Sequence, residues 1–423
     1  YRIGDLSSPI YGTVGYQAPE IAQEGPSVAS DLYTVARTLA VLTFDFTGYQ
    51  GPFRFTLPPP EAVDVFQRFD SLYRFLLKGT AREPDDRFQS AEEMADQLFG
   101  VMREVVAAED GITVPAQSAR FTGELRGKTD RPDWHALPAL RVAADDPAAG
   151  FLATLQATDA ADEVAALRAA PDPTVEVQLR LARALLDAGD PAGAVERCAE
   201  IETEDPWEWR AQWMRGIVLL AQERPAAAMS CFDAVYRAVP GELAPKLALG
   251  VAAESAQQPD VAARWYEIVA RTDPTFTSAF FGLARSRAAC ADRPGALAAY
   301  AAVPASSSGH TEAQMARITL MLAVNPQPAD LRDAGAALDA LALDAETHAR
   351  LAARILEAAL HHVTSGRTPP DPGVTVLGIP FVESELRLGL ERTYRILAHR
   401  ADDGDERIRL VDAANAVRPR TWT

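Results

Sequence analysis

The chain has 423 residues, a formal net charge of -18 and a hydrophobic content of 48%. This length predicts two or three domains, and the balance of apolar and charged residues excludes a disordered chain. The acidic charge argues against nucleic acid as a partner, because binding to phosphates relies on Lys and Arg. No apolar run approaches the roughly 18 residues of a membrane span, so no membrane association is expected.

Three cysteines, Cys198, Cys231 and Cys290, are far apart in the sequence, and each lies in an apolar helical pattern. None belongs to a CxxC pair, and a small buried side chain is the role expected for each of them. Free buried thiols are typical of a reducing compartment. We therefore predict a cytoplasmic protein.

Three motifs follow one another within residues 1–108. The first runs from Gly12 to Glu20 and reads GTVGYQAPE, the second is Asp31 in a helical pattern that opens with a cap-like Ser30, and the third contains Arg87 in PDDRF. Each is weak alone, since APE occurs by chance and Asp31 could be a helix cap. Their order and spacing resemble the C-terminal half of a protein-kinase catalytic domain, from the activation segment onward.

The kinase resemblance implies a role for each of these residues. Thr13, Gly15 and Tyr16 would form the P+1 loop, which contacts the substrate residue after the phosphoacceptor. Glu20 would form a buried ion pair with Arg87. Asp31 would brace the backbone of the catalytic loop and would start a buried central helix.

The remaining kinase motifs do not occur in this sequence. Gly4-Asp5-Leu6 lacks the order of DFG and lies too near Glu20, so Asp5 is expected to be a loop residue, and no lysine sits in a VAxK strand. We expect the ATP-binding lobe and catalytic loop to lie upstream of residue 1. The resemblance then implies that ATP and Mg²⁺ serve only the longer protein, that this fragment is inactive, and that it holds no catalytic residue or metal ligand.

Residues 109–174 are interrupted by Gly and Pro and read as a linker or crossover. A loop of this length indicates either a function or close packing on a neighbour, and the sequence leaves both open. One short helix is predicted from Ala160 to Ala170, with Thr158 or Asp159 as its cap.

A 34-residue period governs residues 175–308. Small residues repeat at two positions, a large residue at a third and proline at a fourth: Ala182, Gly216, Gly250 and Ala284; Ala194, Ala228, Ala262 and Ala296; Phe232, Tyr266 and Tyr300, with Cys198 in the first unit; Pro206, Pro240 and Pro274. Small residues allow two helices to approach closely, and proline ends the second helix. The pattern is that of four tetratricopeptide repeats, with an irregular helical bundle as the alternative.

In tetratricopeptide repeats the first helices line a groove that binds extended peptides. Applying this register, we expect five groove residues: Arg210, Trp213, Ile217, Leu220 and Lys246. Two of the three tryptophans at 207, 209 and 213 can share one helix face, where a core role is the alternative to ligand contact.

Residues 309–423 keep helical apolar spacing but lose the 34-residue period, as degenerate or capping repeats do. We predict a Pro/Gly loop from Gly366 to Pro380, a helix from about Ser384 to Leu390 and another from Asp405 to Val417. His361 and His362 are adjacent and diverge on a helix, so they are not expected to share a metal. The whole chain is therefore predicted to be mostly α-helical, a kinase-lobe segment followed by an α-solenoid.

A kinase segment followed by tetratricopeptide repeats resembles the actinobacterial serine/threonine protein kinase G family. Segments 240–249, 386–389 and 411–419 also resemble that family. The resemblance implies phosphorylation of protein substrates, with a forkhead-associated-domain regulator of 2-oxoglutarate and glutamate metabolism as the family substrate. It also implies that the repeats recruit substrate peptides and can mediate homodimerisation. The alternative is a non-catalytic repeat scaffold with a kinase remnant; no GxSxG motif supports a hydrolase.

Overall fold

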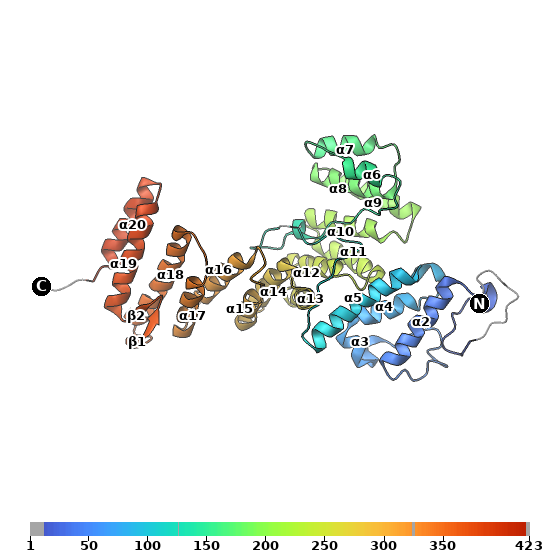
Figure 1. Ribbon diagram of the computed structural model, residues 1–423, viewed down its shortest axis with the longest axis horizontal. Helices are drawn as coiled ribbons and strands as arrows, with labels where there is room; N and C mark the ends of the chain where they lie inside the picture. Colours follow the sequence, from blue (N-terminus) through green and yellow to red (C-terminus); the bar gives the residue numbers. More distant parts are fainter. Residues whose placement is uncertain (1–11, 126, 324–325, 420–423) are drawn as a thin grey trace. The chain divides into compact units, whose positions relative to one another are not determined.

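The computed structural model describes residues 12–125, 127–323 and 326–419, so the Gly4-Asp5-Leu6 segment lies outside the described residues. The chain divides into two compact units, Tyr1–Ser286 and Arg287–Thr423. Helices make up most of both, and a two-stranded hairpin is the only sheet among the described residues (Figure 1). In that part of the chain no helix combines the length and the apolar character needed to cross a membrane.

The first part of unit 1 is a cluster of helices that ends with a long helix, α5. Its elements are α1 Ile21–Glu24, α2 Val28–Thr43, η1 Pro60–Ala62, α3 Asp64–Arg68, α4 Asp70–Gly79, η2 Pro84–Asp86 and α5 Ala91–Glu109. Aromatic rings fill its core, among them Phe66, Phe75 and Phe88, all at most 1% exposed. The predicted cap of α2 was wrong: Ser27 is the N-cap, and Ser30 completes its capping box.

Helix α2 is buried on one side only. Tyr33, Ala36 and Arg37 face the core, whereas Asp31 and Leu42 are exposed. Leu42 exposes 78% of its surface, and Val35 exposes 47%. The prediction of a buried central helix therefore holds for one face and is wrong for the other.

After α5 the described residues 110–125 and 127–141 form an extended segment, which we call the strap. It contains the short helix η3 Trp134–Ala136 and an isolated bridge between Phe121 and Leu140. Two helices follow, α6 Ala149–Thr154 and α7 Ala160–Arg168. The predicted helix at 160–170 is confirmed as α7, and its cap is Asp159.

Paired helices then repeat along the chain. They are α8 Val175–Asp187 and α9 Pro191–Glu204, α10 Trp209–Ala221 and α11 Pro225–Ala238, and α12 Ala244–Ser255 and α13 Pro259–Thr272. Helices α14 Thr277–Ala289 and α15 Arg293–Ala301 follow them in the chain. The small residues allow the helices to approach closely, as the 34-residue period predicts. A Cβ on Gly216 would lie 2.5 Å from the Phe232 ring, and one on Gly250 would lie 2.9 Å from the Tyr266 ring. Only small residues permit these approaches.

Helix α5 packs against the turn between α11 and α12. Gly100 and Gly241 meet there without room for a side chain, since a Cβ on Gly100 would lie 2.2 Å from the carbonyl oxygen of Gly241. The amide of Gly241 donates to Oε1 of the buried Gln97 over 2.8 Å. The kinase-like helices and the repeats of unit 1 thus share a close backbone contact.

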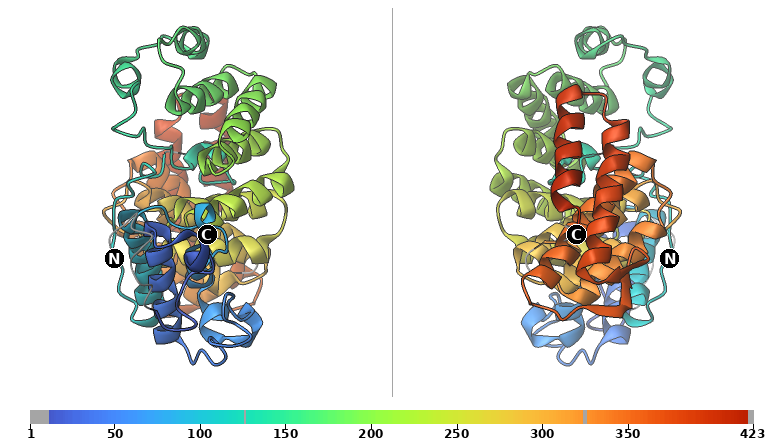
Figure 2. Two further views of the ribbon diagram at one scale, coloured as in Figure 1. Left: turned by 90° about the vertical axis from the view of Figure 1, so that its right-hand side faces the viewer. Right: turned by 90° about the vertical axis from the view of Figure 1, so that its left-hand side faces the viewer.

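Unit 2 continues with helices and one hairpin. Its further elements are α16 His310–Met321, α17 Pro328–Asp339, α18 Ala345–Thr364, β1 Asp371–Val376, β2 Ile379–Phe381, α19 Glu383–Arg400 and α20 Gly404–Val417. Helices α19 and α20 lie side by side in Figures 1 and 2. The prediction of α20 is confirmed within one residue, whereas α19 is much longer than predicted.

The predicted loop at 366–380 contains the hairpin instead. Strands β1 and β2 pair antiparallel, and Leu377 and Gly378 between them both have positive φ, 51° and 70°. Two such residues form the tight turn that suits a hairpin. The sequence signal was weak because leucine rarely adopts positive φ.

The cysteines differ from one another in exposure. Cys198 and Cys231 are buried, as expected, but Cys290 is exposed at the end of α14, so the prediction was wrong for this residue. Burial raises the pKa of Cys198 to about 12. The pKa of Cys231 is raised for the same reason.

Candidate functional site

The predicted P+1 residues form a tight turn on the surface of unit 1. The amide of Tyr16 donates to the carbonyl of Thr13 over 3.1 Å. Gly15 has φ 93°, and a Cβ there would lie 2.7 Å from the carbonyl oxygen of Tyr49. Thr13 is exposed, whereas Tyr16 packs edge-on against Tyr49 with ring centroids 5.4 Å apart. The turn therefore presents Thr13 to solvent from a fixed backbone.

Arg37 holds this turn in place, and the sequence reading missed it. The side chain is fully buried and donates from Nε to the Gly15 carbonyl over 2.8 Å. Its other nitrogens donate to the carbonyls of Tyr49, Phe53 and Thr56. Burial lowers the pKa of Arg37, because it penalises the charged form. The sequence did carry one signal for this role. Arg37 lies four positions after Tyr33, so it is a charged residue on the apolar face of a predicted helix.

Glu20 and Arg87 form the predicted ion pair. The two terminal guanidinium nitrogens of Arg87, Nη1 and Nη2, donate to the Glu20 carboxylate over 2.6 and 2.7 Å. Arg87 also donates to the carbonyls of Ala81 and Arg82 and lies over the Tyr33 ring. The pair fastens the end of the APE motif to the loop before α5. Asp31 lies apart from it, exposed in the first turn of α2.

The second candidate site is the face formed by the first helices of the repeats, and the strap crosses it. Phe121 is 1% exposed and packs against Trp209 and Trp213 of α10, with ring centroids 5.5 and 4.9 Å apart. Farther along, Trp134 lies under the guanidinium of Arg183 on α8, 5.3 Å from the ring centroid. The strap thus contributes aromatic rings to this face at two places.

Polar contacts extend the crossing to α14. The Glu124 carboxylate accepts from the amide of Ser278 at the start of α14, over 3.0 Å. Arg285, also on α14, donates to the carbonyl of Thr129. Burial raises the pKa of Glu124, although its hydrogen bonds to Ser278 act in the opposite direction. For residues 109–174 the sequence left open whether the long loop has a function or packs closely on a neighbour. The part that forms the strap packs closely on the repeats.

The five residues predicted to line an open groove do not do so. Trp213 and Lys246 are 0% exposed, Ile217 is 2% and Leu220 is 8% exposed. Arg210 is less covered, but its guanidinium pairs with Glu176 and Glu208. The prediction was wrong because it treated the repeats as an isolated solenoid, whereas Phe121 of the strap packs on Trp213 and Glu104 of α5 pairs with Lys246.

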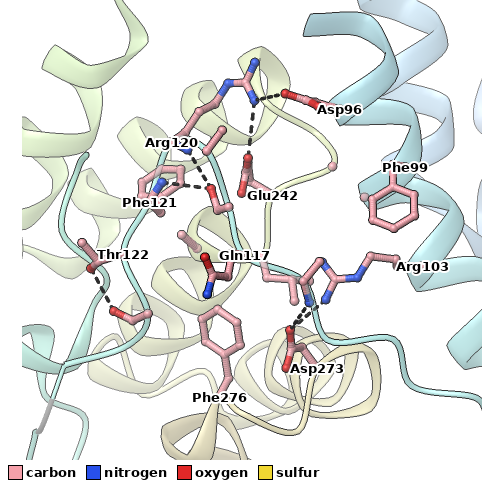
Figure 3. A pocket seen from close by; sticks show the side chains of 18 of the residues that line it. Asp96, Phe99, Arg103, Gln117, Arg120, Phe121, Thr122, Glu242, Asp273 and Phe276 are labelled. Carbon is pink, nitrogen blue, oxygen red and sulfur yellow. Dashed lines mark hydrogen bonds and ion pairs between the residues drawn. The ribbon is translucent and has the colours of Figure 1, made fainter. Parts of the chain in front are cut away.

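A pocket of about 320 Å³ lies where the strap passes between α5 and the repeats (Figure 3). At one side Arg120 is joined to Asp96 and Glu242, and at the other Arg103 pairs with Asp273 over 2.7 Å. Burial raises the pKa of Glu242. Both of these arginines are thus paired with carboxylates that line the same pocket. Nowhere in the described ranges do three His, Cys, Asp or Glu side chains gather as metal ligands would.

These helix pairs at a 34-residue spacing, joined to a helical segment with a braced APE motif, define a tetratricopeptide-repeat protein with a kinase-like segment. The model of the protein kinase G tetratricopeptide repeat matches residues 98–421, and the chain belongs to this family. Repeats of this kind generally mediate contacts between proteins.

Two curated relatives are similar over 97% of the chain. Both are described as serine/threonine-protein kinase PknG: one from Mycolicibacterium smegmatis is 33% identical, and one from Mycobacterium leprae is 35% identical. The chain spans 58% of the length of each relative. A solved tetratricopeptide repeat protein from Parabacteroides merdae is 14% identical, with a TM-score of 0.33 over 47% of this chain and 76% of that one.

Proposed function

We propose that the chain is the acceptor-binding and repeat part of a serine/threonine protein kinase that transfers phosphate from ATP, with Mg²⁺, to protein substrates in the cytoplasm. The observation that carries the proposal is the braced turn. Arg37 fixes the Gly15 carbonyl, and Arg87 fixes Glu20, so the exposed Thr13 is held in one place. Such positioning is what phosphoryl transfer requires of an acceptor platform.

The exposed face of α2 supports the same proposal. Two apolar side chains, Val35 and Leu42, are exposed on that face together with Asp31, so the face is available to contact further kinase structure. By this proposal the catalytic loop would contact Thr13 and Asp31. The chain by itself would transfer no phosphate.

The family resemblance suggests the substrate class. We propose a forkhead-associated-domain protein that regulates 2-oxoglutarate and glutamate metabolism, recruited with the help of the repeats. Homodimerisation through the repeats belongs to the same proposal.

The test measures phosphate transfer to such a substrate by the natural gene product that carries this chain. Thr13→Ala and Gly15→Ala should lower kcat/KM by roughly 10-fold to 100-fold, because the acceptor is misplaced. Thr154→Ala on α6 is the matched control, since Thr154 is exposed and distant in sequence from the turn. Equal kcat/KM for all variants would overturn the acceptor role.

A non-catalytic repeat scaffold is the second candidate. The repeats themselves favour it, because repeats of this kind generally mediate contacts between proteins. In the same assay a scaffold would bind the substrate protein without consuming ATP, and Thr13→Ala would not change that binding.

A further inference from the structure

The strap contacts the repeat face in the manner of a bound peptide. It is extended, it crosses the first helices of the repeats, and among its described residues before η3 only Phe121 has a large side chain that is fully buried. Most residues from 111 to 130 that the structure describes are exposed or half-buried. The strap therefore has the character of a ligand on a surface more than that of a core element.

Phe121 supplies the first anchor. Its ring meets Trp209 and Trp213, and Trp213 packs in turn against Phe232 of α11 with centroids 5.3 Å apart. Aromatic anchors of this kind carry a large share of binding energy at interfaces. The indole nitrogen of Trp213 is buried and has no hydrogen-bond partner among the described residues.

Glu124 supplies the second anchor, three residues later. Its carboxylate accepts from the backbone amide and the hydroxyl of Ser278 in the first turn of α14. The first amides of a helix have no partner within the helix, so an acceptor oxygen there satisfies them. Between the anchors, a Cβ on Gly123 would meet nothing within 4 Å. The position before the second anchor therefore has room for a side chain.

We propose that the face crossed by Phe121 and Glu124 is a binding site for an extended peptide of a partner protein, with an aromatic residue followed three positions later by Glu or Gln, and that the strap occupies this site until the partner displaces it. Either side chain presents the acceptor oxygen that Ser278 requires. The inference rests on the repeat part of the proposed function, the recruitment of protein partners. It does not depend on phosphate transfer, and its test reads binding alone.

The experiment uses a fluorescent peptide with the sequence of residues 117–125 and the whole chain as receptor. In the Phe121→Ala/Glu124→Ala variant the strap loses both anchors, so the peptide should bind this variant at least about tenfold more tightly than the wild type. Circular dichroism establishes that the variant is folded. Saturable binding to the folded variant supports the proposal, and absence of binding overturns it.

Peptide variants test the two anchors separately. Replacing the aromatic residue by alanine, or the glutamate by alanine, should weaken binding by about tenfold, whereas glutamine in place of glutamate should retain it. Equal binding by all four peptides would overturn the proposal, because the contact would then be nonspecific.

A second measurement needs no receptor variant and covers the case in which the double variant does not fold. In the wild type the amide of Ala116, in the strap, donates to the carboxylate of Asp273 in the repeats over 3.4 Å. Excess peptide should speed hydrogen exchange at this amide, because a displaced strap loses this bond. Unchanged exchange at saturating peptide would mean that the strap stays in place, which also overturns the proposal.

Discussion

The ammonium group of Lys246 lies 2.9 Å from the Glu104 carboxylate, and the two side chains are 0% and 3% exposed. Lys246 is on α12 in the third repeat, and Glu104 is on α5, so the pair joins the repeats to the kinase-like helices. Lys246 also donates to the Pro240 carbonyl over 2.8 Å and lies 4.9 Å from the Tyr236 ring centroid. Lys246 was predicted to contact a peptide in a groove, but it is instead buried and joins α12 to α5.

Lys246→Met should lower the free energy of unfolding by about 3–5 kcal/mol, because it leaves Glu104 buried without its counter-ion. Lys246→Met/Glu104→Leu should recover most of that loss, since no charge is then left buried. Urea denaturation followed by tryptophan fluorescence measures both. Lys128→Met is the control: Lys128 is exposed and the change should stay within about 0.5 kcal/mol. A double variant as unstable as the single one would contradict the explanation.

Arg37→Lys should lower the free energy of unfolding by roughly 2–4 kcal/mol, although it keeps the charge. A lysine cannot reproduce the planar fork that reaches the carbonyls of Gly15, Phe53 and Thr56 together. Thermal or urea unfolding measures the effect. Arg54→Lys is the matched control, because Arg54 is exposed in the same loop region. If both substitutions cost the same, Arg37 does not brace the turn.

Glu124 should make the strap less stable as the pH rises. Burial holds its folded pKa above the ordinary value of 4.5. Between 4.5 and the raised pKa the folded protein binds more protons at this site than the unfolded chain does, so stability falls as the pH rises through that window. As the pH is lowered from 7, the free energy of unfolding of the wild type should therefore rise relative to that of the Glu124→Gln variant. A difference that does not vary with pH would contradict the raised pKa.

Only one of the three cysteines should react with a thiol reagent in the folded protein at mildly alkaline pH. Cys290 is exposed, whereas Cys198 and Cys231 are buried and their pKa values are raised by burial. The thiolate is the reactive form, so both burial and the raised pKa slow the buried pair. Mass spectrometry after labelling should show one adduct in the native state and three in denaturant. Cys290→Ser should remove the native adduct, and labelling that persists would locate the reactive thiol elsewhere.

Local pattern was enough to predict several features of the fold. The helix pairs of the repeats, helix α7 with Asp159 as one of two candidate caps, and helix α20 were predicted from residues that lie within about one repeat of each other. The Glu20–Arg87 pair came from a family motif, and the structure contains it. The hairpin at 371–381 was missed, since its turn uses a leucine at positive φ.

What the sequence by itself determined is the repeat frame, because a 34-residue recurrence of small and large residues specifies how each helix packs on its neighbour. Only the tertiary structure decided which faces of that frame are covered. Phe121 meets Trp213, Glu104 meets Lys246, and Arg37 meets the carbonyls of a loop, all through contacts between distant segments. No local period encodes such a contact, since it depends on the path by which the strap and α5 return across the repeats.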